Sequence, residues 1–190
     1  MQLDKFCADY ANNLSDLLRS SDWSGVAQLG KDMKECWLAG RQVFFCGNGG
    51  SAGNAIHLAN DFLYGIAKST GAGLKVQALS ANPAVMTCLA NDVGYEYIFS
   101  EQLAVLAEAG DLLVVLSGSG NSPNILQVLE QASSMGVKSC AILGYSGGKC
   151  KSLADLSIHF PVEDMQIAED MQLVVGHMLM KWLYQNRPDV

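Results

Sequence analysis

The chain has 190 residues, of which 49% are apolar and 16% are charged, and its formal net charge is −7. This much apolar side chain with so little charge excludes an intrinsically disordered protein. The 12 lysines and arginines are scattered without a basic run, which argues against a nucleic acid as the main ligand. No segment approaches the roughly 18 consecutive apolar residues of a membrane span, and the N-terminus has no secretory signal. We therefore expect a cytoplasmic protein with no membrane partner.

The hydrophobic pattern predicts two helices followed by alternating strands and helices. Apolar residues three and four apart predict helices within 3–18 and 26–37, arranged as an N-terminal hairpin. Short apolar, β-rich runs predict strands at 42–46, 74–79, 111–116, 137–143 and 155–160. Between and after them, helical patterns lie at 51–66, 84–90, 95–108, 122–135, 147–154 and 165–185. This alternation is typical of a parallel sheet covered on both faces, so we predict one α/β domain over 1–190, with helices at 1–40 and the core at 41–190.

The first predicted strand ends in a glycine-rich loop, Cys46-Gly47-Asn48-Gly49-Gly50-Ser51, directly before a helix. Free backbone N–H groups at a helix start favour an anion, although a tight strand-to-helix turn alone would also need glycines. The spacing Gly47-x-Gly49-x-x-Ala52 matches a dinucleotide fingerprint, but the second strand ends without the carboxylate that would bind a ribose. No Gly-Lys-Ser/Thr follows, so a P-loop is excluded.

The third predicted strand ends in a second loop, Ser117-Gly118-Ser119-Gly120-Asn121-Ser122-Pro123-Asn124. Its short hydroxyl and amide side chains beside a helix start suit a phosphate, and a capped loop without a ligand is the alternative. Because both loops follow strands of one parallel sheet, we expect them to meet at a single crevice.

The three histidines lie in different sequence surroundings. His57 lies four residues before Asp61, so both side chains share one helical face, where they could bind a metal or a substrate or make an ordinary surface contact. His177 lies in an apolar helical stretch, where a histidine is commonly a buried structural residue, and His159 is interpreted as structural. The six cysteines have no CxxC spacing, so we expect them to be small buried apolar side chains.

The segments CGNGGSAGNAIHLANDF, ANDVGYEYIFSEQL and GDLLVVLSGSGNSPNIL resemble the sugar isomerase (SIS) domain, and more narrowly the bacterial phosphoheptose isomerases. The resemblance runs from about residue 40 to 180 in the family's order and spacing. It implies a five-stranded parallel sheet between helices and a homotetramer with active sites between subunits. It also implies an aldose–ketose isomerase that converts sedoheptulose 7-phosphate to D-glycero-D-manno-heptose 7-phosphate for the synthesis of lipopolysaccharide or capsule precursors.

The same resemblance assigns roles to individual positions. A zinc ion would be held by His57, Asp61, Glu169 and His177, with Asp61 and His177 also acting as acid and base. The phosphate would bind to Ser51, Ser117, Ser119 and Ser122. The rest of the substrate would contact Asn48, Gly49, Gly50, Gly118 and Glu169, and sugar hydroxyls would bind to Asn91 and Asp92.

Several positions depart from the family's pattern. Asp61 stands where the family has a glutamate, which withdraws the carboxylate by roughly 1.3–1.5 Å. Glu169 stands where a glutamine is usual, and Gln166 where an acid is usual. The helix after Asp61 lacks the family's arginine. Two further hypotheses therefore stay open: a SIS protein that binds phosphosugars or regulates without catalysis, and an isomerase of another phosphosugar.

Overall fold

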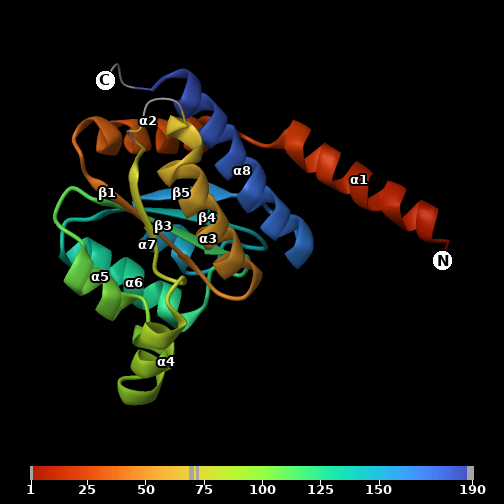
Figure 1. The fold of residues 1–190 in the computed structure, drawn as a ribbon. Helices are drawn as coiled ribbons and strands as arrows, with labels where there is room; N and C mark the ends of the chain where they lie inside the picture. Colours follow the sequence, from red (N-terminus) through yellow and green to blue (C-terminus); the bar gives the residue numbers. More distant parts are fainter. Residues whose placement is uncertain (1, 69–70, 72, 188–190) are drawn as a thin grey trace.

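The computed structural model describes residues 2–68, 71 and 73–187, which form a five-stranded parallel sheet between layers of helices (Figure 1). The five predicted strands are all confirmed, and each of their bounds lies within one residue of the prediction. They are β1 (Gln42–Gly47), β2 (Lys75–Ala78), β3 (Leu112–Ser117), β4 (Lys138–Leu143) and β5 (Leu156–His159). The helices are α1 (Leu3–Ser20), α2 (Ser24–Leu38), α3 (Gly50–Leu63), α4 (Pro83–Asp92), α5 (Ser100–Leu106), α6 (Pro123–Ser134), α7 (Cys150–Leu153) and α8 (Met165–Gln185), with short 3-10 helices η1 (Gly65–Ala67) and η2 (Tyr95–Tyr97).

The strand order in the sheet is β2-β1-β3-β4-β5. The chain runs outward from β1 to β2 and then returns to the other side of β1, so that Val43 of β1 pairs with both Val76 and Leu112. The order thus reverses between β1 and β3. In open parallel sheets, ligands bind at the carboxyl ends of the strands at such a reversal.

Alternate side chains of each strand enter two separate cores. Val43 and Phe45 of β1 point into a cluster built with α2, α3 and α8, and Phe45 stacks on Phe62 of α3 with ring centroids 5.7 Å apart. Phe44 and Cys46 point the other way, into a cluster built with α5 and α6. This alternation follows from the two-residue period of a strand, and Figure 1 shows α2 above the sheet and α5 and α6 below it.

Three predicted helices differ clearly from the observed ones. The helix expected at 147–154 is reduced to the single turn α7, which begins only at Cys150. The helix expected at 95–108 is divided into η2 and α5, because the chain turns inward at Ile98 and Phe99, which are both fully buried. The helix expected at 51–66 ends at Leu63, two residues before Gly65, and the chain continues as η1. Glycine favours such an ending because it costs backbone entropy in a regular helix.

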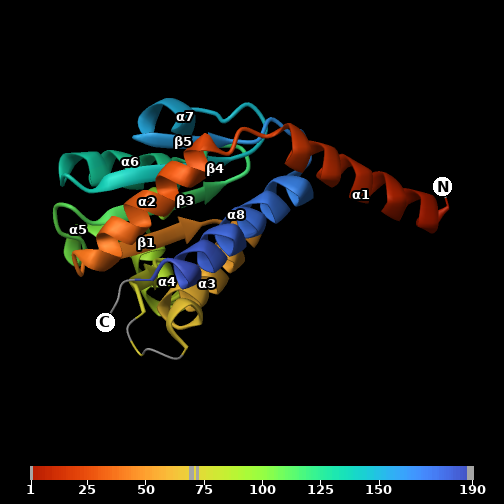
Figure 2. The same ribbon diagram turned by 90° about the horizontal axis from the view of Figure 1, so that it is seen from above.

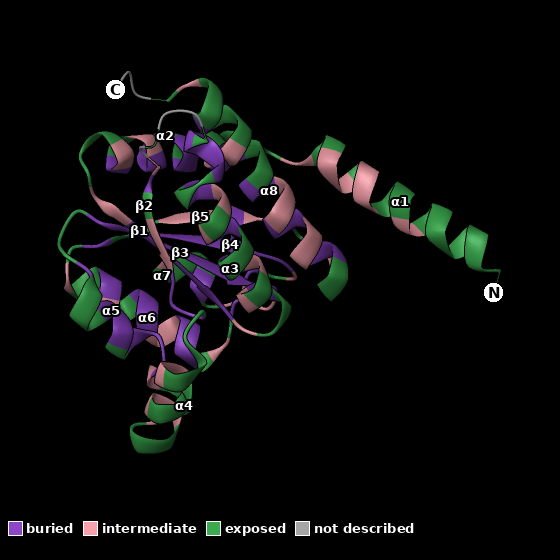
Figure 3. Cartoon of the chain, viewed as in Figure 1, coloured by how far each residue is buried: buried purple, intermediate pink, exposed green. Residues whose placement is uncertain are grey.

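Both predicted N-terminal helices are present, but the predicted hairpin is wrong, because α1 does not fold back along α2 and extends away from the rest of the chain (Figures 1 and 2). Neither α1 nor α4 contains a buried residue, as the colouring in Figure 3 shows. Among the described residues, no helix is both long enough and apolar enough to cross a membrane.

Candidate functional site

A polar cavity of about 250 Å³ lies at the carboxyl ends of β1 and β3, where the strand order reverses. The two loops predicted from the sequence meet there. Nine residues that the family resemblance assigns to the substrate line this cavity, together with Leu116 and Met165: Asn48, Gly49, Gly50, Ser51, Ser117, Gly118, Ser119, Ser122 and Glu169.

A pair of asparagines fastens the two loops to each other. Asn48 Nδ2 donates to Asn124 Oδ1 and Asn124 Nδ2 donates to Asn48 Oδ1, both at 2.8 Å. The hydroxyl of Tyr95 also donates to Asn48 Oδ1, at 3.0 Å. Because Asn124 is fully buried, losing its partner would leave a buried amide without hydrogen bonds. Asn48 therefore braces the cavity wall as well as lining it.

The serines of the cavity accept hydrogen bonds from the protein. Ser117 Oγ accepts from the backbone N–H of Gly120 at 3.1 Å, and Ser119 Oγ accepts from that of Asn121 at 3.3 Å. None of the hydrogen bonds among the described residues uses the hydroxyl proton of Ser51, Ser117 or Ser119 as donor. Each hydroxyl keeps its proton for a ligand, which suits an anion with many acceptor oxygens.

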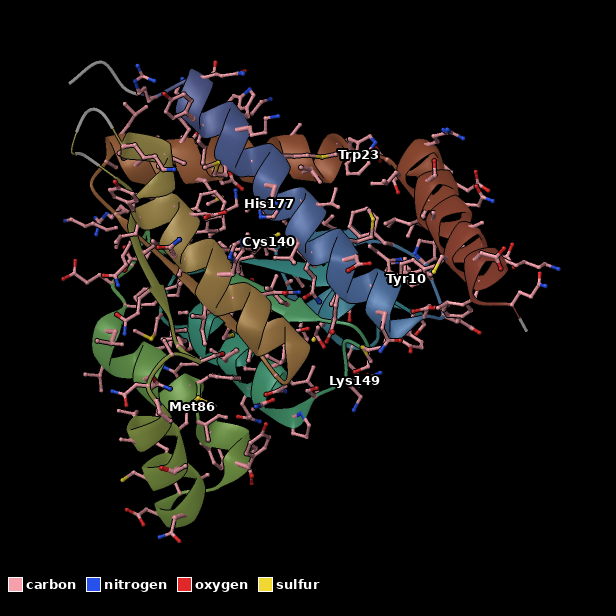
Figure 4. The ribbon with its side chains drawn as sticks, turned by 45° about the vertical axis from the view of Figure 1, so that its right-hand side comes forward. Tyr10, Trp23, Met86, Cys140, Lys149 and His177 are labelled. Atoms are coloured by element: carbon pink, nitrogen blue, oxygen red, sulfur yellow. The ribbon has the colours of Figure 1, made fainter. Side chains whose placement is uncertain are left out.

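A second cluster lies between α3 and α8 and consists of His57, Asp61 and His177. The Nε2 atoms of the two histidines are 3.0 Å apart, and Asp61 Oδ2 is 3.5 Å from that of His57 and 3.6 Å from that of His177. Both histidine side chains are 49% exposed, whereas that of Asp61 is 16% exposed. Figure 4 places His177 on α8 where this helix runs beside α3.

Close approach of the two helices brings these side chains together. A Cβ atom at Gly176 would collide with the side chain of Leu58, and these residues directly neighbour His177 and His57. The glycine thus allows α8 to lie against α3, so that residues 120 positions apart in the sequence share one point in space.

The geometry of this cluster fits a zinc ion. With zinc–ligand bonds of 2.0–2.1 Å, tetrahedral ligands lie roughly 3.3 Å from one another, and the three measured separations are 3.0, 3.5 and 3.6 Å. Two imidazoles and one carboxylate are also a donor set that zinc uses in catalytic sites, where a further position stays open for substrate.

Glu169 lies outside this three-residue cluster and at the cavity instead. Its carboxylate lies directly against Gly50, in the space that a Cβ atom at this position would need. Glu169 and His177 are eight residues apart on α8, a rise of roughly 12 Å. The cavity and the histidine cluster therefore lie along the same pair of helices, and the assignment of Glu169 as a zinc ligand stays a prediction.

Asn91 and Asp92 are not among the described residues that line the cavity. They are exposed at the end of α4, where Asn91 Nδ2 donates to Asp92 Oδ1 at 2.7 Å. Their proposed contact with sugar hydroxyls stays a prediction for this chain.

His159 has the structural environment that the sequence suggests. Its Nε2 lies 2.8 Å from the backbone oxygen of Tyr145, and its Nδ1 lies 3.2 Å from Lys151 Nζ.

The prediction that the cysteines are small buried side chains is confirmed for four of them and wrong for two. Those that are buried are Cys36, Cys46, Cys140 and Cys150, whereas Cys7 and Cys88 are exposed. Burial raises the pKa of the Cys46 and Cys140 thiols, so that neither is a reactive thiolate.

Sequence inspection missed four residues that shape the site: Asn54, Tyr95, Asn124 and Gln172. Asn54 lies among small and apolar residues and Gln172 directly precedes an apolar run, which is the one signal in the sequence that could have indicated them.

Comparisons with known proteins identify the family and agree with the overall fold. The model of the SIS domain family matches residues 5–144. Phosphoheptose isomerase of Akkermansia muciniphila is 38% identical over 154 residues, which are 81% of this chain and 81% of that protein. Phosphoheptose isomerase of Rhodospirillum rubrum is 42% identical over 141 residues, or 74% of each chain. The solved structure of a phosphoheptose isomerase from Francisella tularensis has a TM-score of 0.89, with 28% identity, and covers 97% of this chain and 100% of its own.

Proposed function

Because the chain belongs to the SIS domain family, we propose that it is a sugar-phosphate isomerase that converts sedoheptulose 7-phosphate to D-glycero-D-manno-heptose 7-phosphate. The observation that carries this proposal is the position of the serine-lined cavity and the His57–Asp61–His177 cluster along the same two helices. One end can hold a phosphate while the other acts on the carbonyl end of the sugar.

The loops hold the phosphate without a basic side chain. The backbone N–H groups at the start of α3 and the free hydroxyl protons of the cavity serines donate to the phosphate oxygens. Anchoring one end of the sugar fixes the other end, which converts proton transfer into a step between groups already in position.

The isomerisation moves one proton between neighbouring carbons. A base removes the proton α to the carbonyl, an enediol forms, and the proton returns at the adjacent carbon. Asp61 serves as the base, and His177 exchanges the proton on the neighbouring oxygen. A zinc ion, held by His57, Asp61 and His177, would stabilise the negative charge on the enediolate oxygens.

The proposed function can be tested at Asp61, whose side chain is shorter than the glutamate of the family. We expect the native protein to convert sedoheptulose 7-phosphate when zinc is present and to lose this activity with a chelator, as followed by NMR of the product. Asp61→Asn removes the base and should abolish turnover. Asp61→Glu then separates the substrates: a raised rate supports the heptose reaction, whereas a lost rate indicates a pocket built around aspartate for another phosphosugar.

The remaining alternative is a SIS protein without catalysis. In that case neither the native protein nor Asp61→Glu would convert the substrate, even with zinc added, while both would still bind phosphosugars. That outcome would refute the isomerase and leave a binding or regulatory protein.

The proposed assembly is a homotetramer of single SIS domains spanning 1–190, acting in the cytoplasm on precursors of surface polysaccharides. Its support is the exposed apolar surface: α1 and α4 bury no residue, and an apolar groove of about 440 Å³ lies between α2 and α8, lined in part by Trp23, Met178 and Trp182. Contacts between subunits would also bring further residues to each site. Sedimentation should give about four times the chain mass of 20.3 kDa, and a mass of a single chain would refute the tetramer.

A further inference from the structure

Gln172 connects α8 to the wall of the cavity through two hydrogen bonds. Its Nε2 donates to Ser51 Oγ and its Oε1 accepts from Asn54 Nδ2, both at 3.0 Å. Asn54 Nδ2 also donates to the backbone oxygen of Glu169, at 3.0 Å. Gln172 is only 1% exposed, so water cannot replace a partner that it loses.

These bonds fix which end of the Gln172 amide faces Ser51. Asn54 Nδ2 donates to the backbone oxygen of Glu169, which can only accept, so this NH2 group faces α8. The group of Gln172 that faces Asn54 must therefore be its carbonyl oxygen. The amide nitrogen of Gln172 must then point toward Ser51. If the amide of Gln172 were reversed, its NH2 group would face the NH2 group of Asn54, so two donors would meet. Its carbonyl oxygen would then face Ser51 and would compete with the ligand for the hydroxyl proton.

The amide of Gln172 in turn sets the direction of the Ser51 hydroxyl. A serine hydroxyl has one proton to donate and lone pairs that accept. Ser51 Oγ accepts a hydrogen bond from Gln172 Nε2, and none of the hydrogen bonds among the described residues uses the hydroxyl proton of Ser51. Ser51 lines the cavity in the first turn of α3, so its proton is available to a ligand there.

We propose that Gln172 is a positioning residue that holds the Ser51 hydroxyl as a hydrogen-bond donor to a phosphate oxygen. The proposal rests on the proposed function, because it requires a phosphate in this cavity. Backbone N–H groups orient Ser117 and Ser119 in the same way, whereas Ser51 depends on a side chain 121 residues away.

Two substitutions at Gln172 separate hydrogen-bond direction from packing. Gln172→Glu keeps the shape and still accepts from Asn54, but it accepts from Ser51 as well and so turns the hydroxyl proton away from the cavity. Gln172→Met has similar length and no hydrogen bond, which leaves the Ser51 proton free. The probe is inorganic phosphate, with its dissociation constant measured by calorimetry on the intact protein.

We expect Gln172→Glu to weaken phosphate binding about ten- to a hundredfold, the loss of one hydrogen bond to a charged group, and Gln172→Met to weaken it about threefold or less. In turnover of sedoheptulose 7-phosphate, Gln172→Glu should raise KM while kcat changes by less than about threefold. Equal losses in the two variants would refute the proposal, because packing alone would then explain them.

A double variant excludes direct charge repulsion by the new carboxylate. If Gln172→Glu acts through Ser51, it weakens phosphate binding no further in a Ser51→Ala background than Ser51→Ala does alone. An additive loss would overturn the proposal. If the native protein binds no phosphate at all, the phosphate site itself is refuted, whereas phosphate binding that Gln172→Glu leaves unchanged refutes only the role of Gln172.

Asn54→Asp tests the same idea if the charge at position 172 prevents folding. It keeps Gln172 but places an acceptor opposite its carbonyl oxygen, which favours the reversed amide. Phosphate binding should fall about tenfold and the fall should again vanish in the Ser51→Ala background. A loss that persists in that background would count against Ser51 as the mediator.

Discussion

The serine-lined cavity and the histidine cluster lie along the same two helices, but they differ in how far their side chains are buried and hydrogen-bonded to the protein. At the cavity, two of the serines and the asparagine that braces the loops are buried and bound to the protein: Ser51 is 4% exposed, Ser117 is 5% exposed and Asn124 is fully buried. In the cluster, His57 and His177 are each 49% exposed and contact only one another and Asp61 among the hydrogen bonds and ion pairs of the described residues.

This difference separates anchoring from chemistry. A phosphate is bound by donors that already point at it, so little ordering remains to be done on binding. A centre for metal and proton transfer needs free lone pairs and open space, which hydrogen bonds to the protein would occupy. Substitutions at the two regions should therefore affect different measurements.

The largest effect is expected for His177→Ala. Removing this imidazole takes away an acid or base and a zinc ligand, so turnover should fall on the order of 10²- to 10⁴-fold. Binding of inorganic phosphate should stay within about twofold, because the serine loops are intact. His159→Asn serves as the control histidine, since it lies outside both regions. A parallel loss of phosphate binding in His177→Ala would show that the two regions are not separate.

The fold could be predicted from the sequence because its signals are local. Each strand is a short apolar run, since a parallel sheet buries both of its faces, and all five runs form strands in the predicted places. The two polar loops could also be recognised, because the carboxyl ends of parallel strands meet at one edge. The direction of α1 could not be predicted, since helical periodicity indicates an apolar face and not what covers it.

The hydrogen bonds that brace the site could not be predicted from the sequence. Asn48 and Asn124 are 76 residues apart, and Ser51 and Gln172 are 121 residues apart, so no spacing rule connects them. The meeting of His57 and His177 depends on the contact between Gly176 and Leu58, which is a property of packing between helices. Only the family resemblance placed both histidines in one site.

The next effect in size is expected at the cavity serines. Ser119→Ala and Ser122→Ala each remove one donor to a charged oxygen, so phosphosugar binding should weaken about ten- to a hundredfold. Turnover at saturating substrate should change much less, since the histidine cluster is untouched. Calorimetry and steady-state kinetics measure the two effects. Unchanged affinity in both variants would refute the assignment of this loop to the phosphate.

A smaller effect is expected from Asn124→Ala, which breaks the reciprocal pair with Asn48. The free energy of unfolding should fall by about 1–3 kcal/mol, because Asn48 loses a buried partner. Urea denaturation measures this loss, and phosphate binding should weaken with it as the two loops separate. Full stability together with weaker binding would mean that Asn124 contacts the ligand instead of bracing the loops.

The smallest effect is expected at Tyr10, whose hydroxyl donates to Asp170 on α8 at 2.5 Å and which Figure 4 shows between α1 and α8. The hydrogen bond to this carboxylate raises the pKa of Tyr10 to about 12, since ionisation would remove the bond and set two negative charges side by side. The raised pKa stabilises the fold below the ordinary tyrosine pKa of about 10, and this contribution is lost as the pH rises through about 12.

Because solvent reaches this contact, Tyr10→Phe should lower the free energy of unfolding at neutral pH by less than about 1 kcal/mol. Absorbance titration should also lose one tyrosine that ionises near pH 12. Neither phosphate affinity nor turnover should change, although Asp170 directly follows Glu169 on α8. A change in phosphate affinity alone would mean that α1 steadies the Glu169 side of the cavity. A change in turnover alone would connect α1 to the histidine cluster instead, so this variant tests how far each region depends on the outer helix.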